Sequence, residues 1–393
     1  MFKGQYVFSQ ITDHLPLHTF RRCVERYHGE RYVKQFRCFD QYLAMSFAQL
    51  THRESLRDIE ACLKAQSSKL YHMGLRSSIS RSTLADANEQ RDWRIYADFA
   101  QALIKIARPL YAGDELGLDL KNTVYALDAS TIDLCFSVFP WALFRSTKSA
   151  VKLHTLLDLR GNIPSFIHIS EGKLHDVNAL DMIIPEAGSF YVMDRAYLDF
   201  ERLFSLNNSG AFFVIRSKNN ILFKRRYSSP VEKTNGIRCD QTIRLTGLNT
   251  KNKYPKPLRR VKYHDNETNK TLNLLTNNEI IPAQTVADLY RHRWKVELFF
   301  KWIKQHLHIR TFFGTSENAL KSQIWIAISV YVLIAIIKKQ LKIKAELYTI
   351  LQVLSLTLFE KIPLEQLLGN KHYMTHIHEN AIQLNLFDNL TGH

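Results

Sequence analysis

The chain has 393 residues, a hydrophobic content of 46% and a formal net charge of +16 at pH 7. This length allows two or three domains with a sizeable core, and this hydrophobic content excludes a largely disordered protein. The positive charge favours polyanionic partners, with nucleic acid before an anionic membrane surface.

Residues 1–115 are predicted to be mostly helical, because apolar residues recur at helical spacing in this region. The N-terminal stretch has no long apolar run and no small-residue cleavage site, so we expect no signal peptide. Ser80 or Ser82 is suited to cap a helix. Two short helices around Gly74 are compatible with a helix-turn-helix or with a plain helical bundle. A helix-turn-helix would direct these side chains toward DNA: Arg81, Asn88 and Arg91.

From about residue 120 the pattern changes to strands. The segment TVYALDAST is a short apolar strand with Asp128 near its end. Two further strands are joined by a hairpin turn at 160–162, and a helix follows with Asp176 as its expected N-cap. The segment SFYVMDRAY is another apolar strand, which ends in Asp194 and precedes a helix that stops near Gly210. These elements predict an α/β fold with a mixed sheet and helices packed on it.

Residues 216–280 read as short alternating strands and form a β-rich insertion. The segment contains 15 Lys or Arg residues against 5 Asp or Glu residues, which is over half of the net charge in about a sixth of the chain. This concentration predicts a nucleic-acid-binding surface. We expect four arginines of the insertion to contact DNA: Arg225, Arg226, Arg259 and Arg260.

A long amphipathic helix is predicted from 284 to 311, followed by an apolar helix near 320–340. The apolar run at 324–337 is too short to cross a membrane comfortably and is predicted to be a buried core helix. The apolar stripe of the first helix is formed by Leu289, Val296, Phe300, Ile303 and Leu307. A second stripe beside it is formed by Tyr290, Arg293, Glu297, Lys301 and Lys304. A solvated face with an Arg293–Glu297 ion pair is the simpler alternative.

Three acids suggest a metal site. Asp128 and Asp194 end apolar strands, and such positions lie at the edge of the sheet where α/β folds keep their sites. Glu297 is the natural third acid, since its helix carries the apolar stripe needed to pack on that sheet. Mg²⁺ prefers carboxylate and phosphate oxygens, and a two-metal site places ions about 3.5–4 Å apart for attack at phosphorus. Arg293 and Lys304 would then lie beside the scissile phosphate.

Other acidic and basic residues have simpler explanations as ion pairs, caps or surface groups. Asp133 is the hardest acid to exclude, because the first strand can continue through it. The remaining alternatives are Asp158, Asp181, Asp199, Lys152, His154 and the pair His175–Asp176. Five cysteines without a C-x-x-C pair indicate reduced thiols of a cytosolic protein and not a zinc site.

The spacing Y-x2-R-x3-E-x6-K is present at Tyr290, Arg293, Glu297 and Lys304. It follows a D-A-S strand and a D-R-x-Y strand in the same order as in a known family. Over residues 115–315 the chain therefore resembles the DDE transposases of bacterial insertion sequences, of the family-four type with the Y-R-E-K signature.

The resemblance implies an RNase H-like fold with Asp128, Asp194 and Glu297 as ligands of two Mg²⁺ ions, which Mn²⁺ can replace. It also implies that phosphates at the transposon end are held by Tyr290, Arg293 and Lys304. We expect Lys301, on the same stripe of the helix, to contact DNA as well. We expect five segments: a helical DNA-binding domain at 1–115, the first part of the RNase H-like core at 116–215, the β-rich basic insertion at 216–283, the glutamate helix of the core at 284–315 and a helical C-terminal region at 316–393.

The family moves DNA by cutting and pasting. Water nicks the 3′ end of the element, the freed hydroxyl cuts the opposite strand to leave a hairpin, and the reopened end attacks target DNA. The resemblance implies a homodimer on inverted-repeat ends, in the bacterial cytoplasm at the nucleoid and with no membrane partner. A nuclease or junction resolvase without strand transfer, and a non-catalytic DNA-binding regulator, are the alternative functions.

One departure concerns the hairpin step. A related enzyme stacks a flipped base on a tryptophan of its insertion, whereas residues 216–280 contain no tryptophan. An aromatic side chain can substitute by stacking on the base. The candidates are Tyr227, Tyr254, Tyr263 and Phe223.

Overall fold

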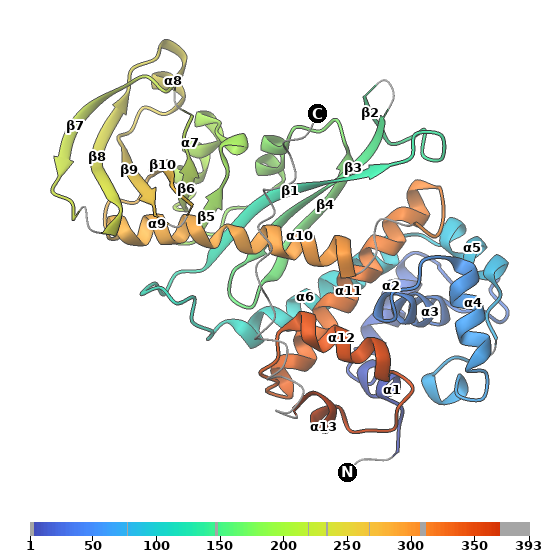
Figure 1. Cartoon of the computed structure of the whole chain (residues 1–393). Helices are drawn as coiled ribbons and strands as arrows, with labels where there is room; N and C mark the ends of the chain where they lie inside the picture. Colours follow the sequence, from blue (N-terminus) through green and yellow to red (C-terminus); the bar gives the residue numbers. More distant parts are fainter. Residues whose placement is uncertain are drawn as a thin grey trace, which may run out of the picture.

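The computed structural model describes residues 4–76, 78–145, 148–218, 220–232, 235–266, 268–306 and 312–369. In Figure 1 the N-terminal helices, in blue, and the C-terminal helices, in orange and red, lie together at one end of the molecule. A large sheet extends from them, and the strands of the basic insertion lie at its far end. Helix α10 (Trp294–His306) runs across the sheet and packs on strand β1 (Val124–Leu134).

The N-terminal region is helical, as predicted. Its elements are α1 (Val7–Thr12), α2 (Leu17–Arg26), α3 (Cys38–Leu50), α4 (Leu56–Ala65), the 3-10 turn η1 (Tyr71–Met73), α5 (Arg81–Gln90) and α6 (Arg94–Tyr111). Ser80 is the N-cap of α5, and its hydroxyl accepts a hydrogen bond from the Thr83 N–H at 3.2 Å. Helix α3 is buried on nearly all sides, so it forms the centre of this helical bundle.

Two of the three side chains that a helix-turn-helix would direct toward DNA lie inside this bundle. Asn88 is buried and accepts a hydrogen bond from the Gln41 amide at 2.7 Å. Arg91 is also buried and donates to the Gln41 side chain and to the Arg37 carbonyl, each at 2.9 Å. Of the two alternatives for this region, these contacts favour the plain helical bundle, because Asn88 and Arg91 connect α5 and its C-terminal end to α3. Arg81 is exposed at the start of α5.

The core sheet has the predicted mixed arrangement. Its strands are β1, β2 (Leu143–Arg145), β3 (Lys148–Asp158), β4 (Ile163–Glu171), β5 (Phe190–Met193) and β6 (Phe212–Arg216). The spatial order β4-β3-β1-β5-β6 combines an antiparallel β1-β3-β4 meander with β5 and β6 parallel to β1. This RNase H-like topology confirms the predicted fold class.

Short helices follow β4 and β5: η2 (Asp176–Met182), η3 (Arg195–Tyr197) and α7 (Phe200–Asn208). Asp176 is not the N-cap of its helix, since His175 holds that position and the Asp176 carboxylate binds Lys152 Nζ at 2.9 Å. Asp199 does cap α7, because its carboxylate accepts hydrogen bonds from the N–H groups of Glu201 and Arg202.

The basic insertion continues the same sheet. It contains β7 (Phe223–Ser229), β8 (Ile237–Leu245), α8 (Leu248–Lys253), β9 (Leu258–Asp265) and β10 (Lys270–Thr276). Strand β10 pairs antiparallel with β6, with Leu275 opposite Ile215. The four strands were correctly predicted as strands, but they extend the core sheet to ten strands and do not form a separate body.

The predicted helix from 284 to 311 is divided in two. Helix α9 (Ala283–His292) ends at Arg293, and α10 begins one residue later. The expected apolar stripe is buried at Leu289, Val296, Phe300 and Ile303, whereas Leu307 lies outside the described residues. Helix α9 packs on β6, β8, β9 and β10, so the pair of helices spans both the core strands and the insertion.

The apolar helix α11 (Glu317–Gln340) packs along α6 and lies in the interior. It is long and apolar enough to cross a membrane, but 94% of its most apolar window is buried by the rest of the protein. The prediction of a core helix is confirmed. Helices α12 (Leu347–Thr357) and α13 (Leu364–Gly369) complete the described part of the C-terminal region.

Candidate active site

Asp128 lies on β1 with its side chain toward α10. Side chains alternate between the two faces of a strand, so Asp128 shares its face with Val124 and Ala126. One carboxylate oxygen accepts the Ala129 N–H at 2.8 Å, and the other accepts Nη1 of Arg293 at 3.1 Å. The second Nη of Arg293 binds the Glu297 carboxylate. A single guanidinium therefore connects the first strand of the core to helix α10.

Asp194 directly follows the end of β5 and lies beside Asp128, which is in the middle of the parallel strand β1. Leu127 on β1 and Met193 on β5 are register partners, and each of the two acids is the next residue in its strand direction. The Asp194 carboxylate accepts the Arg195 N–H at 2.6 Å and so caps the short helix η3. The fold thus brings the two aspartates together where β5 ends, but the prediction that Asp128 ends its strand is wrong, because β1 continues to Leu134 in its pairing with β3.

The charges at this edge interact. Burial raises the pKa of Asp128 to about 6, while the Arg293 guanidinium and the Ala129 N–H act to lower it. The negative charges of Glu297 and Asp194 raise the pKa of Asp128 further. The three acids and Arg293 therefore lie within electrostatic range, and the Asp128 side chain, at 21% exposure, is more buried than that of Glu297, at 33%.

The other residues of the Y-R-E-K spacing surround this cluster. Tyr290 is buried, and the guanidinium carbon of Arg293 lies 5.8 Å from the centre of its ring. Lys304 donates a hydrogen bond to the Thr131 carbonyl of β1 at 2.6 Å. Lys301 is exposed on α10. The break between α9 and α10 occurs at Arg293, whose guanidinium pairs with Asp128 and Glu297.

The carboxylates at this edge are the kind of ligand that a divalent cation prefers. In the structure they are instead ion-paired with Arg293. Within the described ranges, no three His, Cys, Asp or Glu side chains converge closely enough to hold a metal, and Arg293 neutralises Asp128 and Glu297. Two buried polar atoms beside these acids lack a hydrogen-bond partner among the described residues: Thr155 Oγ1 and Arg293 Nε. Thr155 is directly opposite Asp128 in the β1–β3 register. Carboxylate oxygens and adjacent unpaired donors match the needs of hydrated Mg²⁺ or Mn²⁺.

The rival acids have other surroundings. Asp133 continues β1, as considered above, but it is exposed and lies on the face opposite Asp128. Asp158 pairs with Arg108 at 3.4 Å, and Asp181 pairs with Arg202 at 2.7 Å. These partners account for the two acids as ion pairs.

Lys152 and His154, the two alternative site residues on β3, also have partners inside the protein. Lys152 donates to the Leu174 carbonyl at 2.8 Å as well as to Asp176. His154 is buried, and its Nε2 lies 2.9 Å from the Ser170 hydroxyl. Burial lowers the pKa of His154 to about 4, so this imidazole is neutral at pH 7.

The four arginines of the insertion divide into two kinds. Arg225 and Arg226 are exposed on β7. Arg259 is buried, and its guanidinium binds both carboxylate oxygens of Asp240 at 2.7 and 2.8 Å. The expectation that Arg259 contacts DNA is therefore wrong, because its donors are used inside the protein. Arg260 is half-buried and donates to the side chains of Gln241 and Asn273, each at 2.9 Å.

The aromatic candidates for base stacking divide in the same way. Tyr254 and Tyr263 are buried and cannot receive a base without unpacking the core. Tyr227 is 62% exposed and Phe223 is 37% exposed, both on β7. The two exposed aromatic candidates thus lie on the same strand, β7, as Arg225 and Arg226.

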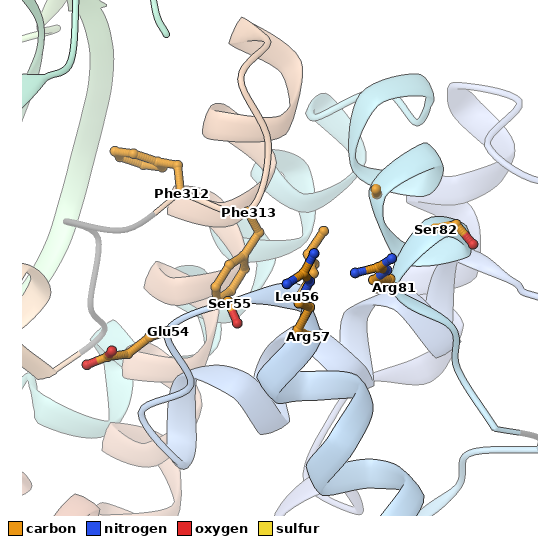
Figure 2. A pocket seen from close by; sticks show the side chains of 9 residues that line it. Glu54, Ser55, Leu56, Arg57, Arg81, Ser82, Phe312 and Phe313 are labelled. Atoms are coloured by element: carbon orange, nitrogen blue, oxygen red, sulfur yellow. The ribbon is translucent and has the colours of Figure 1, made fainter.

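A separate recess of about 470 Å³ lies in the N-terminal bundle, where α4 and α5 begin (Figure 2). Arg57 and Arg81 line it from the two helices, and Phe312 and Phe313 line it from the segment before α11. Neither guanidinium forms an ion pair within the part of the chain that the structure describes. Arg57 was not singled out from the sequence, because its position opposite Arg81 depends on how the helices pack.

Comparison with known proteins agrees with this architecture. Residues 119–333 match the family model described as "Transposase DDE domain", and residues 3–76 match a domain of unknown function, DUF4372. A protein of Sinorhizobium fredii that is named as a transposase is 31% identical over 285 residues, which cover 71% of this chain and 77% of that protein.

A second curated relative and one solved structure are also similar to this chain. The transposase named for insertion sequence element IS5377 of Geobacillus stearothermophilus is 32% identical over 218 residues, which are 55% of this chain and 57% of that protein. A solved structure of the piggyBac transposase synaptic complex with hairpin DNA has a TM-score of 0.45 and 11% identity, with coverage of 95% of this chain and 83% of that chain.

The molecule is therefore a DNA transposase of the DDE type. The family model spans more than half of the sequence, and the acids at the sheet edge lie inside the matched range. The chain belongs to the transposase DDE domain family, whose relatives include transposases of bacterial insertion sequences. Membership of this family implies the use of a divalent metal and binding to DNA.

Proposed function

We propose that this transposase performs cut-and-paste transposition, with metal-dependent hydrolysis followed by strand transfer at the inverted-repeat ends of its element. Asp128, Asp194 and Glu297 are the proposed metal ligands. The observation that supports this assignment most strongly is the contact of one guanidinium, that of Arg293, with both Asp128 and Glu297. This contact brings together acids that lie on different elements and far apart in the sequence.

The donor set suits two Mg²⁺ ions, which Mn²⁺ can replace. When bound, the two ions supply activation of the attacking oxygen and charge stabilisation at the leaving oxygen. The residues of the chain have complementary roles. The carboxylates of Asp128, Asp194 and Glu297 would hold the metal ions, and the Arg293 guanidinium would bind a phosphate of the DNA with its planar pair of N–H donors. The Tyr290 ring packs against the Arg293 guanidinium. Lys304 and Lys301 extend the positive surface along α10.

DNA binding is proposed to extend over the exposed cations on both sides of this site. On the insertion these are Arg225 and Arg226 of β7, with Arg260 partly available and with Tyr227 or Phe223 placed to stack on a base. In the N-terminal bundle the recess between α4 and α5 presents Arg57 and Arg81. Because two transposon ends must be held at once, we propose that two copies of the chain act together, in the cytoplasm at the nucleoid.

The test uses a plasmid that carries the native DNA flanking the gene, with Mg²⁺ as the metal. Asp128→Ala, Asp194→Ala and Glu297→Ala should each abolish end cleavage and leave binding to end DNA nearly unchanged. Asp133→Ala is the matched control, since this acid lies on the same strand but on the opposite face, and it should cleave as wild type does. Strand-transfer products joined to target DNA should appear with wild type and with the control only.

Other results would reject parts of the proposal. Wild-type cleavage by Glu297→Ala would show that the third ligand is a different residue. Cleavage without any joined product would favour a nuclease or resolvase. DNA binding by wild type without cleavage in either metal, and with no change in Asp128→Ala, would favour a non-catalytic regulator.

A further inference from the structure

Thr155 carries a buried hydroxyl that packing alone does not explain. It lies on β3, is 0% exposed, and its Oγ1 has no hydrogen-bond partner among the described residues. A buried hydroxyl without a partner destabilises a folded protein. Valine is also β-branched and nearly the same shape, and it would fill this position without a polar atom. The hydroxyl therefore indicates an acceptor that it meets when a ligand is bound.

The pairing of the strands indicates which neighbour that acceptor is. Thr155 is the register partner of Asp128 on β1 and of Ile167 on β4, and both pairings are antiparallel. Directly opposite residues point to the same face of a sheet, with Cβ atoms about 4.5–5.5 Å apart. Along β3 the neighbours on this face are Leu153 and Leu157, which belong to the main apolar cluster, as Ile167 does. Of these four neighbours, Asp128 alone has side-chain oxygens that can accept a hydrogen bond.

The Asp128 carboxylate can accept a further donor. Its Oδ1 accepts the Ala129 N–H at 2.8 Å, and its Oδ2 accepts Nη1 of Arg293 at 3.1 Å. Each carboxylate oxygen can accept two hydrogen bonds, so these donors leave lone pairs for a metal and for one more hydroxyl. At the Cβ separation of register partners, a change of rotamer at either side chain is enough to bring the Thr155 hydroxyl to the Asp128 carboxylate.

We propose that Thr155 is a positioning residue of the metal site, whose hydroxyl donates a hydrogen bond that orients the Asp128 carboxylate for metal binding. This inference rests on the proposed function, in which Asp128 is a metal ligand. Ligating carboxylates are generally held by such neighbouring hydrogen bonds. Strand β3 pairs with β1 on both sides of Asp128, so the donor is carried by a fixed neighbouring strand and not by a loop.

The chain contains a matched control for this hydroxyl. Ser322 is also 0% exposed, and its Oγ has no hydrogen-bond partner within the described ranges. It lies on α11, which packs along α6, and not on any element that carries one of the three acids. Ser322→Ala therefore removes a buried, unpaired hydroxyl of the same kind at a position outside the candidate active site.

The experiment measures Mn²⁺ binding to the full chain from the loss of the free-Mn²⁺ resonance signal, together with thermal unfolding in the absence of metal. Thr155→Val should weaken Mn²⁺ binding by about 10- to 100-fold, the usual effect of removing a hydrogen bond to a metal ligand. Its melting temperature should stay equal or rise, because no bond is lost in the metal-free protein. Thr155→Ser keeps the donor and should bind Mn²⁺ nearly as wild type does. Ser322→Ala should bind as wild type does, and Asp128→Ala should lose this binding.

End cleavage provides a second readout. Thr155→Val should cleave poorly at low Mn²⁺ and recover at saturating Mn²⁺, because the hydroxyl acts through the metal ligand and not on the DNA. Cleavage that stays impaired at saturating Mn²⁺ would contradict a role in metal binding.

The remaining outcomes distinguish the role of Thr155 from the metal site itself. If Thr155→Val binds Mn²⁺ as wild type does while Asp128→Ala does not, the role of Thr155 is wrong and the metal site stands. If Thr155→Ser loses as much affinity as Thr155→Val, the shape of the side chain is responsible and the role of the hydroxyl is again wrong. A clear loss of stability in metal-free Thr155→Val would also contradict the proposal, since the hydroxyl would then have a partner without metal. If Asp128→Ala binds as wild type does, the proposed metal site is itself wrong.

Discussion

Two largely buried arginines of this protein, Arg259 and Arg293, form ion pairs with acids but differ in how completely their donors are paired. In the insertion, Arg259 binds both oxygens of Asp240 and donates its remaining Nη to the Ile281 carbonyl at 2.6 Å. In the core, Arg293 divides its guanidinium between two acids, Asp128 and Glu297, and its buried Nε has no partner. The side chains are 9% and 16% exposed, so burial alone does not distinguish them.

The difference lies in how completely the polar groups are paired. The Arg259 pair is saturated, which suits a fixed connection between strands β8 and β9. The Arg293 cluster contains an unpaired Nε, and the buried Thr155 hydroxyl, opposite Asp128 in the β1–β3 register, also has no partner among the described residues. Such incomplete pairing costs stability and is typical of sites that bind a ligand. A buried ion pair can therefore belong either to a structural connection or to a ligand-binding site. Full pairing of the neighbouring hydrogen-bond donors indicates the first, and incomplete pairing indicates the second.

The largest expected effect on stability is at Arg259. Arg259→Ala leaves the Asp240 carboxylate buried and unpaired, which should lower the free energy of unfolding by about 3–5 kcal/mol. The midpoint of urea unfolding measures this change. Adding Mg²⁺ should not restore the lost stability, because nothing in this pair resembles a metal site. A midpoint equal to that of wild type would show that the pair is not a structural connection.

A smaller loss is expected at Arg293, and here metal should matter. Arg293→Ala leaves two carboxylates without their shared donor, at a cost of about 1–3 kcal/mol in metal-free buffer. Mg²⁺ should recover much of this loss, since a cation can neutralise the same acids, whereas end cleavage should remain strongly impaired. Unfolding with and without Mg²⁺ gives the comparison, with Arg259→Ala as the control. Equal Mg²⁺ responses of the two variants would remove the distinction drawn between them.

The smallest effect on stability is expected on β7. Arg225→Ala and Arg226→Ala change exposed side chains, so the free energy of unfolding should stay within about 0.5 kcal/mol of wild type. Each replacement should reduce the slope of log affinity against log salt by about 0.9 if the arginine contacts a phosphate. Titrations of duplex DNA at several salt concentrations measure this slope. An unchanged slope in both variants would exclude β7 from the DNA-binding surface.

Local patterns in the sequence predict the strands, the buried stripe of α9 and α10, and the position of Asp194 at the end of β5, whereas they end the strand of Asp128 too early. They do not predict that Arg259 is paired, because the acid that binds it lies on another strand. Alternation along β9 indicates only that Arg259 and Arg260 face opposite sides. The break at Arg293 carries no glycine or proline signal. The burial of Asn88 likewise depends on Gln41 of another helix, which no local pattern connects to it.

The pairing of β10 with β6 has a consequence for shortened versions of this protein. A deletion that joined residue 216 to residue 283 would remove β7 through β10 and leave β6 as the last strand. Its row of N–H and C=O groups would then have no neighbour and would offer a template for other chains. We expect such a protein to aggregate even with every acid of the active site intact. The core strands thus need the insertion to stay soluble, independently of the DNA contacts that either part makes.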